Sequence, residues 1–178
     1  MLIKSCLMAI SVVLAVSGIA TAQPKKDPAS GSINTYPDCT LVGGNLITNC
    51  RFDTGDFTGW IQGGDPSFQN VVTGCGHSGN FCASMGSTGY NGTLTQSVAT
   101  AASTCSLSFW LNNTGQPSHF GVEWNGQHIM ELKDVPDFPA YTQFSASGLP
   151  ASGTAFVTFQ FYNVPSFINF TDVVVTCP

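Results

Sequence analysis

Six side chains that can recognise a hydroxylated ligand stand at alternate positions of three stretches of apolar sequence, residues 104–112, 119–124 and 154–163. Successive side chains of a β-strand point to opposite faces, so in each stretch one alternate set is apolar and the other is polar or aromatic. If the three strands share a sheet, the second set lines one concave surface. The members of this predicted surface are Trp110, Asn112, His119, Glu123, Gln160 and Tyr162.

The chemistry of this set favours a sugar. An aromatic ring offers a flat partner to the apolar C–H face of a pyranose, and amides and carboxylates form hydrogen bonds with hydroxyls. Trp110 and Tyr162 are the expected platforms, and the other four residues are the expected polar contacts. Two alternatives stay open: Trp110 packs under a long loop such as residues 113–118, or loops rather than the sheet face bind the ligand. Trp60 and Trp124 are interpreted as core residues.

The residue pattern does not predict an enzyme. His77 stands next to Ser78, but a serine nucleophile with a histidine base also needs an orienting carboxylate and an oxyanion hole, and no motif marks either. Glu123 and Glu131 are the only glutamates of the chain, and neither lies in a recognisable glycosidase motif. We therefore interpret His77 as a turn residue whose ring caps backbone groups, and a hydrolase is the least favoured class.

The first 22 residues have the pattern of a secretory signal peptide: a lysine, an apolar run and the small residues Ala20 and Ala22 at the cleavage site. The apolar run falls short of the ~20 residues that a membrane span needs. Four basic and ten acidic residues follow residue 22, a net charge of −6, which makes nucleic acid and anionic lipid poor partners. The sequence predicts a secreted protein without membrane insertion, in the periplasm or on the cell surface if it is bacterial.

Six cysteines follow the predicted cleavage site, an even number that is typical of disulfides in an exported chain. Structural zinc is the alternative, but no pair has the close C-x-x-C spacing of such a site. Several pairings are possible. We expect Cys75 to pair with Cys82 across a hairpin, Cys39 with Cys50 at the N-terminal strand, and Cys105 with Cys177 between two long strands.

The rest of the chain consists of short alternating or apolar runs separated by Gly, Pro and Asn turns, without a sustained helical period. Residues 1–22 are assigned to the signal peptide, 23–44 to a flexible N-terminal tether and 45–178 to one all-β domain. Asn125 and Gly126 predict a type I′ hairpin turn, because both central positions need positive φ. Ten strands are expected, over residues 45–51, 68–73, 81–85, 93–99, 104–112, 119–124, 128–132, 141–146, 154–163 and 167–177.

Five motifs follow one another in the order known from a protein superfamily. They are NLITNCRFDTGDFTGW (45–60), GHSGNFCASMG (76–86), LTQSVAT (94–100), SLSFWLNN (106–113) and FINFTDVVVT (167–176). Together they resemble the galactose-binding-like jelly rolls of exported bacterial proteins of the PEP-CTERM type and of carbohydrate-binding modules. The resemblance implies a jelly-roll β-sandwich, which the disulfides expected from the cysteine count would stabilise.

The same resemblance implies a structural calcium ion. In the calcium-bearing modules, an acid of the opening motif and an aspartate of the closing motif share the cation, and the matching positions here are Asp53 and Asp172. Calcium takes six to eight oxygen ligands, and the backbone of residues 53–56 can supply carbonyls. The chain departs from the pattern at Thr171, where the family usually has another aspartate. The alternative is that Asp53 or Asp56 forms a hydrogen bond with the backbone of a turn.

The leading expectation is a secreted, non-catalytic protein that binds an oligosaccharide or polysaccharide in the cell envelope, matrix or adhesion. The alternative is an extracellular jelly roll with a structural or protein-binding role and no sugar ligand. Aromatic residues gathered in one groove with polar partners favour the first class, and a broad apolar patch favours the second.

Overall fold

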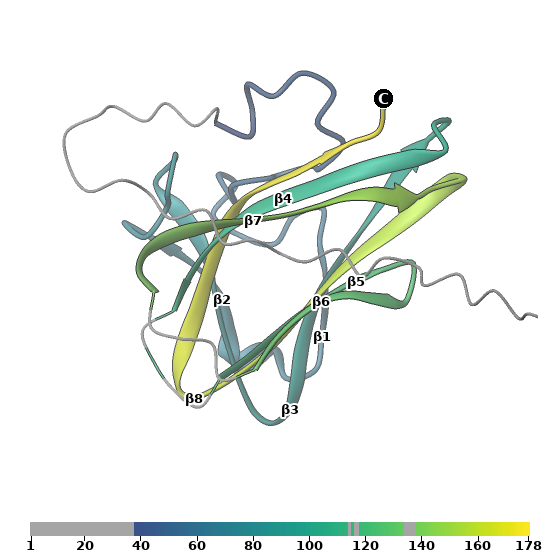
Figure 1. Ribbon diagram of the computed structural model, residues 1–178. Coiled ribbons are helices and arrows are strands. Elements are labelled where there is room, and N and C mark those ends of the chain that lie inside the picture. Colours follow the sequence, from purple (N-terminus) through teal and green to yellow (C-terminus); the bar gives the residue numbers. More distant parts are fainter. Residues whose placement is uncertain (1–37, 114, 116–117, 134–137) are drawn as a thin grey trace, which may run out of the picture.

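The computed structural model describes residues 38–113, 115, 118–133 and 138–178. The predicted signal peptide and residues 23–37 of the predicted tether lie outside these residues. Eight strands and one short 3₁₀ helix make up the described chain (Figure 1): β1 (Ile61–Gly63), η1 (Pro66–Phe68), β2 (Gln69–Thr73), β3 (Phe81–Thr100), β4 (Thr104–Asn113), β5 (Ser118–Trp124), β6 (Gln127–Lys133), β7 (Phe138–Pro150) and β8 (Gly153–Thr176). No helix in this part of the chain is long and apolar enough to span a membrane.

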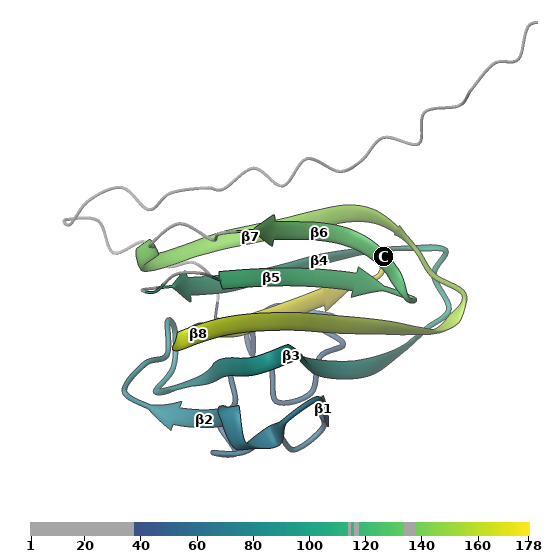
Figure 2. The same cartoon turned by 90° about the horizontal axis from the view of Figure 1, so that it is seen from below.

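The strands form two antiparallel sheets of a sandwich, and the long strands β3 and β8 belong to both. In the first sheet, residues 81–85 of β3 pair with β2 and with β8, and residues 168–176 of β8 also pair with β4, which pairs with β7. In the second sheet, residues 93–100 of β3 pair with residues 153–160 of β8, with β1 and β5 on either side and β6 beyond β5. Figure 2 shows β6, β5, β8 and β3 following one another across this second sheet.

Aromatic rings from both sheets fill the space between them. Phe159 lies at the centre, with ring centroids 5.2 Å from Phe109, 6.0 Å from Phe120 and 5.0 Å from Phe170. All four side chains are completely buried. Burial of this much apolar surface is the main stabilising contribution to such a fold. The alternation read from the sequence is confirmed, because the apolar set of each of the three stretches faces the core.

The predicted disulfides are confirmed. The structure pairs Cys39 with Cys50, Cys75 with Cys82 and Cys105 with Cys177. Trp60 and Trp124 lie in the core, as predicted. Asn125 and Gly126 have φ values of 52° and 75°, the positive φ that a type I′ turn between β5 and β6 requires.

The prediction of a first strand over residues 45–51 is wrong. This segment runs as turns beside the end of β8, where Leu46 N donates to Val175 O at 2.8 Å and Val173 N donates to Cys50 O at 2.9 Å. Asn49 has a φ of 53°, which ends any extended run, and its side chain bonds within the turn. Asparagine tolerates this left-handed conformation because its short polar side chain forms local hydrogen bonds.

Four other predicted strands merge in pairs. Residues 81–85 and 93–99 belong to the single strand β3, and residues 154–163 and 167–176 belong to β8, which ends one residue before the predicted boundary at Cys177. Register shifts at residues 85–92 mark the place where β3 passes from one sheet to the other. The short edge strand β1 was not expected from the sequence.

Candidate ligand-binding face

The structure divides the six residues of the predicted surface between the two sheets. Trp110 and Asn112 lie on β4 in the first sheet, whereas the other four lie on β5 and β8 in the second. The expectation that the three strands share a sheet is wrong, because β4 pairs with β7 and with the last part of β8, and not with β5. The residues that stay together are His119, Glu123, Gln160 and Tyr162.

These four residues belong to the outer face of the second sheet, here called the polar face. Its positions alternate with the buried residues of β3, β5 and β8, so they point away from the core. Neighbouring strands place His119 opposite Tyr162, Gly121 opposite Gln160, and Glu123 opposite Thr158. The polar face is formed by Thr95, His119, Gly121, Glu123, His128, Glu131, Thr158, Gln160 and Tyr162.

Glu123 is held between two nitrogen atoms of neighbouring strands. Gln160 Nε2 on β8 donates to Glu123 Oε1 at 2.7 Å, and His128 Nε2 on β6 lies 3.2 Å from the same oxygen. The side chain of Glu123 is only 19% exposed. The carboxylate is thus fixed in direction, and together with the amide it offers both acceptors and donors beside each other.

His119 and Glu131 form the second polar pair of this face. His119 Nε2 lies 3.4 Å from Glu131 Oε1, and Lys133 Nζ lies 3.3 Å from the same oxygen. The contact of His119 is too long or too poorly directed for a hydrogen bond, so its Nε2 is buried without a hydrogen-bond partner. An unsatisfied buried polar atom of this kind costs free energy.

Gly121 lies between these two pairs. A Cβ atom at Gly121 would lie 3.5 Å from Gln160 Oε1 and 3.7 Å from His119 Nε2. The missing side chain therefore leaves a gap of only about the size of a methyl group, and Gly121 itself is buried. The glycine brings an amide and an imidazole to the same point of the polar face.

Two members of the second sheet were missed in the sequence analysis. Phe156, on the same side of β8 as Thr158, Gln160 and Tyr162, is 47% exposed. His128 completes the contacts of Glu123. The alternation that placed Gln160 outside the core applies equally to Phe156, so the signal for this residue was available.

Trp110 is not exposed on a sheet face. It is 3% exposed, and the ring of His77 stacks on it with centroids 3.9 Å apart and an angle of 16° between the planes. The alternative that Trp110 packs under a loop is confirmed for the loop between Cys75 and Cys82, while the loop named in that alternative, residues 113–118, lies partly outside the described residues. Asn112 is half-buried on the same strand and lies opposite Asn169 of β8.

Asp172 holds the loop between Cys75 and Cys82 in place. Ser78 N donates to Asp172 Oδ2 at 3.1 Å, Ser78 Oγ donates to Oδ1, and His77 Nδ1 lies 3.3 Å from Oδ2. Burial by itself raises the pKa of Asp172, but the hydrogen bonds from His77 and Ser78 outweigh it and hold the pKa below its ordinary value. His77 is thus bound to a side chain, contrary to its interpretation as a cap of backbone groups.

The same geometry gives no serine nucleophile. Ser78 Oγ and His77 Nδ1 both turn to the carboxylate of Asp172. A nucleophilic serine instead donates its proton to the histidine, which the carboxylate orients from the other side. The arrangement therefore serves to fasten the loop.

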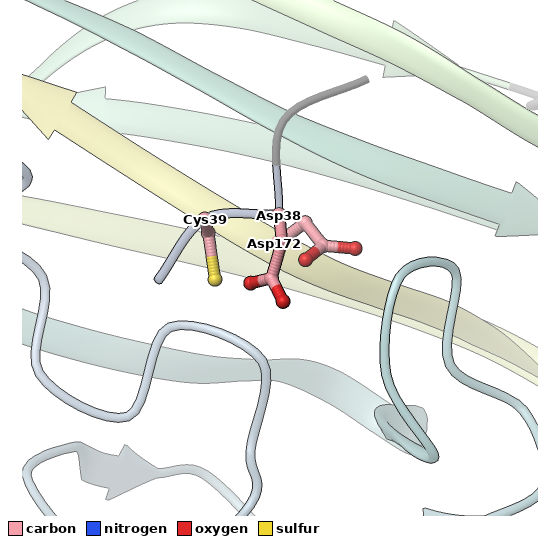
Figure 3. Close-up of side chains that lie close together, drawn as sticks. All are labelled: Asp38, Cys39 and Asp172. Carbon is pink, nitrogen blue, oxygen red and sulfur yellow. The ribbon is translucent and has the colours of Figure 1, made fainter. Parts of the chain in front are cut away.

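The predicted calcium ligands fit an ion poorly. Asp53 accepts a hydrogen bond from Arg51 Nε, and both oxygens of Asp172 accept from the loop donors described above. Carboxylate oxygens of Asp38 and Asp172 lie within 4.8 Å of each other and of Cys39 Sγ (Figure 3), but that sulfur belongs to a disulfide. Calcium requires six to eight oxygens, and here donors and a guanidinium already engage the carboxylates.

Asp56 forms hydrogen bonds within a turn, which was the alternative to calcium binding. Thr58 N donates to Asp56 Oδ1 at 2.9 Å, and Thr54 Oγ1 donates to the same oxygen at 2.7 Å. Hydrogen bonding by the side chains of Thr58 and Thr54, and then by the Thr58 backbone, lowers the pKa of Asp56. Asp56 therefore shapes the corner between residues 52 and 60 without a metal.

Comparison with known proteins identifies relatives in structure only. No protein-family model matches the chain, and no curated protein matches it in sequence. The solved structure of TmCBM61 in complex with β-1,4-galactotriose is similar at a TM-score of 0.64 and 16% identity, over 75% of this chain and 99% of that one.

Two further solved structures are similar. The K3 cleaved adhesin domain of Lys-gingipain from Porphyromonas gingivalis matches at a TM-score of 0.56 and 18% identity, over 70% of this chain and 94% of that one. The C-terminal family 22 carbohydrate-binding module of Clostridium thermocellum Xyn10B matches at a TM-score of 0.56 and 10% identity, over 76% of this chain and 95% of that one. Likeness at such identities shows the fold: the chain is a jelly-roll β-sandwich of the kind found in carbohydrate-binding modules.

Proposed function

We propose that this protein is a non-catalytic carbohydrate-binding domain that acts outside the cell, and that the polar face is its binding surface. The observation that carries the proposal is the row of polar groups on this face, in which the Gln160 amide is fixed on the Glu123 carboxylate and the imidazole of His119 lies beside them at Gly121. Three disulfides support an extracellular location, since such bonds persist in oxidising compartments. The jelly-roll fold supports the ligand class by likeness only.

The polar face suits a neutral sugar. The Gln160 amide and the Glu123 carboxylate lie side by side, so that adjacent hydroxyls of one ring can donate to one group and accept from the other. Tyr162, which lies opposite His119, supplies an aromatic ring for the apolar face of a pyranose. The carboxylate of Glu131 lies 3.3 Å from Lys133 Nζ, and that of Glu123 accepts from the Gln160 amide, so both carboxylates already have partners on this face.

The proposal keeps four of the six residues predicted from the sequence. Trp110 is covered by His77 and does not take part. Asn112 lies with it in the first sheet. The ligand contacts assigned to His119, Glu123, Gln160 and Tyr162 stay predictions that need a binding measurement.

The test is a binding assay of the oxidised protein against soluble glycans and insoluble polysaccharides, with Gly121→Val as the diagnostic variant. A β-branched residue suits a strand, and its methyl groups occupy the gap, so the variant should fold normally but bind at least about tenfold more weakly, the equivalent of one lost hydrogen bond. Ala99→Val is the matched control, since Ala99 is exposed on the outer side of the same sheet but pairs with Thr154 away from the gap.

Two results would contradict the proposal. Failure of the wild-type protein to bind any glycan would remove the function itself. If Gly121→Val binds a glycan as tightly as the wild type does, the polar face is not the binding site, although the protein still binds carbohydrate.

A second candidate function is protein binding. Ile61 is 68% exposed on β1 and Phe156 is 47% exposed on β8, and both belong to the outer side of the second sheet. Exposed apolar side chains on one face favour a protein contact. Retention of binding to a protein partner after Gly121→Val, with loss after Phe156→Ser, would support this alternative.

A further inference from the structure

Arg51 is the only arginine of the chain, and it lies among aspartates. Its Nη1 donates to Asp38 Oδ2 and its Nε donates to Asp53 Oδ2. The side chain of Arg51 is 25% exposed, and that of Asp38 is 20% exposed. A guanidinium with two carboxylates at two of its nitrogens is a strong and directional ion pair.

A third carboxylate belongs to the same cluster. A ligand oxygen of Asp172 on β8 lies within 4.8 Å of one of Asp38, and Figure 3 shows the two carboxylates side by side. The hydrogen bond to Asp53, together with the charges of Asp38, Asp53 and Asp172, raises the pKa of Arg51 against the opposing effect of burial. The cluster has three negative groups and one positive group: Asp38 and Asp53 contact the guanidinium, and Asp172 lies beside Asp38.

Four segments of the chain meet at this guanidinium. Asp38 and Arg51 are the direct neighbours of Cys39 and Cys50, so the disulfide places the two charged residues opposite each other. The loop between Cys75 and Cys82 packs on the cluster through Gly79, where a Cβ would lie 3.0 Å from Arg51 Cδ and 3.4 Å from Asp53 Oδ1. The fourth segment is β8, which contributes Asp172.

We propose that the guanidinium of Arg51 takes the place of a structural divalent cation. Its positive charge holds together the segments that carry Asp38, Asp53 and Asp172, so that the domain needs no calcium. A calcium ion gathers carboxylates from separate segments through its charge and its oxygen coordination. Arg51 holds Asp38 and Asp53 through N–H donors, and it attracts Asp172 through its charge alone. A second cation beside it would meet direct repulsion. The inference is independent of sugar binding.

The test uses thermal unfolding of the oxidised protein with chelator, with calcium and with magnesium. The variants are Arg51→Met, which keeps the length and removes the charge, and Arg51→Lys, which keeps a positive charge without the planar fork. Lys133→Met is the control, since Lys133 is the other basic residue of the described chain and its side chain is 74% exposed.

The expected results differ between the proteins. The wild type should unfold at the same Tm in chelator and in millimolar calcium. Arg51→Met should lose roughly 5 °C in Tm, because three carboxylates remain without a cation, and calcium but not magnesium should restore part of the loss. A cavity of about 260 Å³, lined by Asn45, Asn49 and Asp53 among others, gives a calcium ion and its water room to enter in the variant. The Tm of Arg51→Lys should lie between those of the wild type and Arg51→Met, and the Tm of Lys133→Met should equal that of the wild type.

Three outcomes would overturn the proposal. A fall in the Tm of the wild type in chelator would show that it uses calcium itself, and this measurement needs no variant. An Arg51→Met protein as stable as the wild type would show that the cluster needs no cation. If Arg51→Met is destabilised and calcium does not raise its Tm, Arg51 acts only as a partner in an ordinary ion pair and does not replace a metal ion.

Discussion

Asp172 carries an unusual combination of features at one position. It is 3% exposed, its φ is 52° within a strand, and it accepts hydrogen bonds from His77 and Ser78. Aspartate and asparagine tolerate this conformation better than other residues with a side chain. The residue type is thus required twice, by the backbone and by the loop that its carboxylate binds.

The lowered pKa of Asp172 predicts a loss of stability in acid. A carboxyl group whose pKa is lower in the folded than in the unfolded state stabilises the fold above its unfolded pKa, and the stabilisation disappears as the pH falls through the folded value. We expect the Tm of the wild type to fall steeply below about pH 4. The Tm of Asp172→Asn should be lower than that of the wild type at neutral pH, but it should depend less on pH in the acid range. Asparagine keeps the backbone conformation, so parallel pH curves for the two proteins would assign the acid sensitivity to other carboxylates.

At the scale of elements, the loop between Cys75 and Cys82 covers the outer side of the first sheet. His77 stacks on Trp110 of β4, and Tyr141 of β7 donates its hydroxyl to Cys75 O at 2.6 Å. Burial, and then the charge of Asp172, raises the pKa of Tyr141 above its usual range. The raised pKa keeps the hydroxyl protonated, as a donor to Cys75 O must be. The loop is thus attached to β4 through Trp110 and to β7 through Tyr141.

Removal of Trp110 is therefore expected to affect stability rather than sugar binding. Trp110→Ala leaves a cavity under His77 and should lower the free energy of unfolding by about 3–5 kcal/mol, measured by urea denaturation. Binding of the folded fraction to a glycan should be unchanged. Lost binding with unchanged stability would instead make Trp110 the platform that the sequence predicted.

At the scale of the whole molecule, the sandwich depends on two strands that cross from one sheet to the other. Because β3 and β8 are shared, the first and second sheets cannot separate without breaking continuous strands. The disulfide between Cys105 and Cys177 ties the start of β4 to the end of the chain, across a separation of 72 residues. A crosslink across a long segment restricts the unfolded chain most.

The chain-entropy argument predicts different effects for two disulfides. Replacing Cys105 and Cys177 by alanine should cost about 4 kcal/mol of unfolding free energy, and replacing Cys75 and Cys82, separated by 7 residues, about 2 kcal/mol. Denaturation midpoints of the two double variants at neutral pH compare them directly. A larger loss for the Cys75 and Cys82 variant would show that the loop contacts of Asp172 and Trp110 outweigh chain entropy.

Local chemistry made several features readable from the sequence alone. Alternation along 104–112 and 154–163 identified the core residues Phe109 and Phe159, because the period of two is a property of each strand by itself. Asn125 and Gly126 determined a turn for the same reason. The all-β class also follows from composition, and the hairpin pair of Cys75 and Cys82 follows from their close spacing, whereas the pairing of Cys105 with Cys177 depends on how distant strands meet.

Tertiary structure alone decided which predicted residues meet. Alternation states which side of a strand a residue occupies but not which sheet the strand joins, so it did not separate Trp110 from Gln160. The irregular course of residues 45–51, the loop over Trp110 and the cluster around Arg51 all depend on contacts between segments far apart in the chain. Those contacts are selected by packing and hydrogen bonding of the complete fold, and therefore the sequence specified the parts of the site without specifying their assembly.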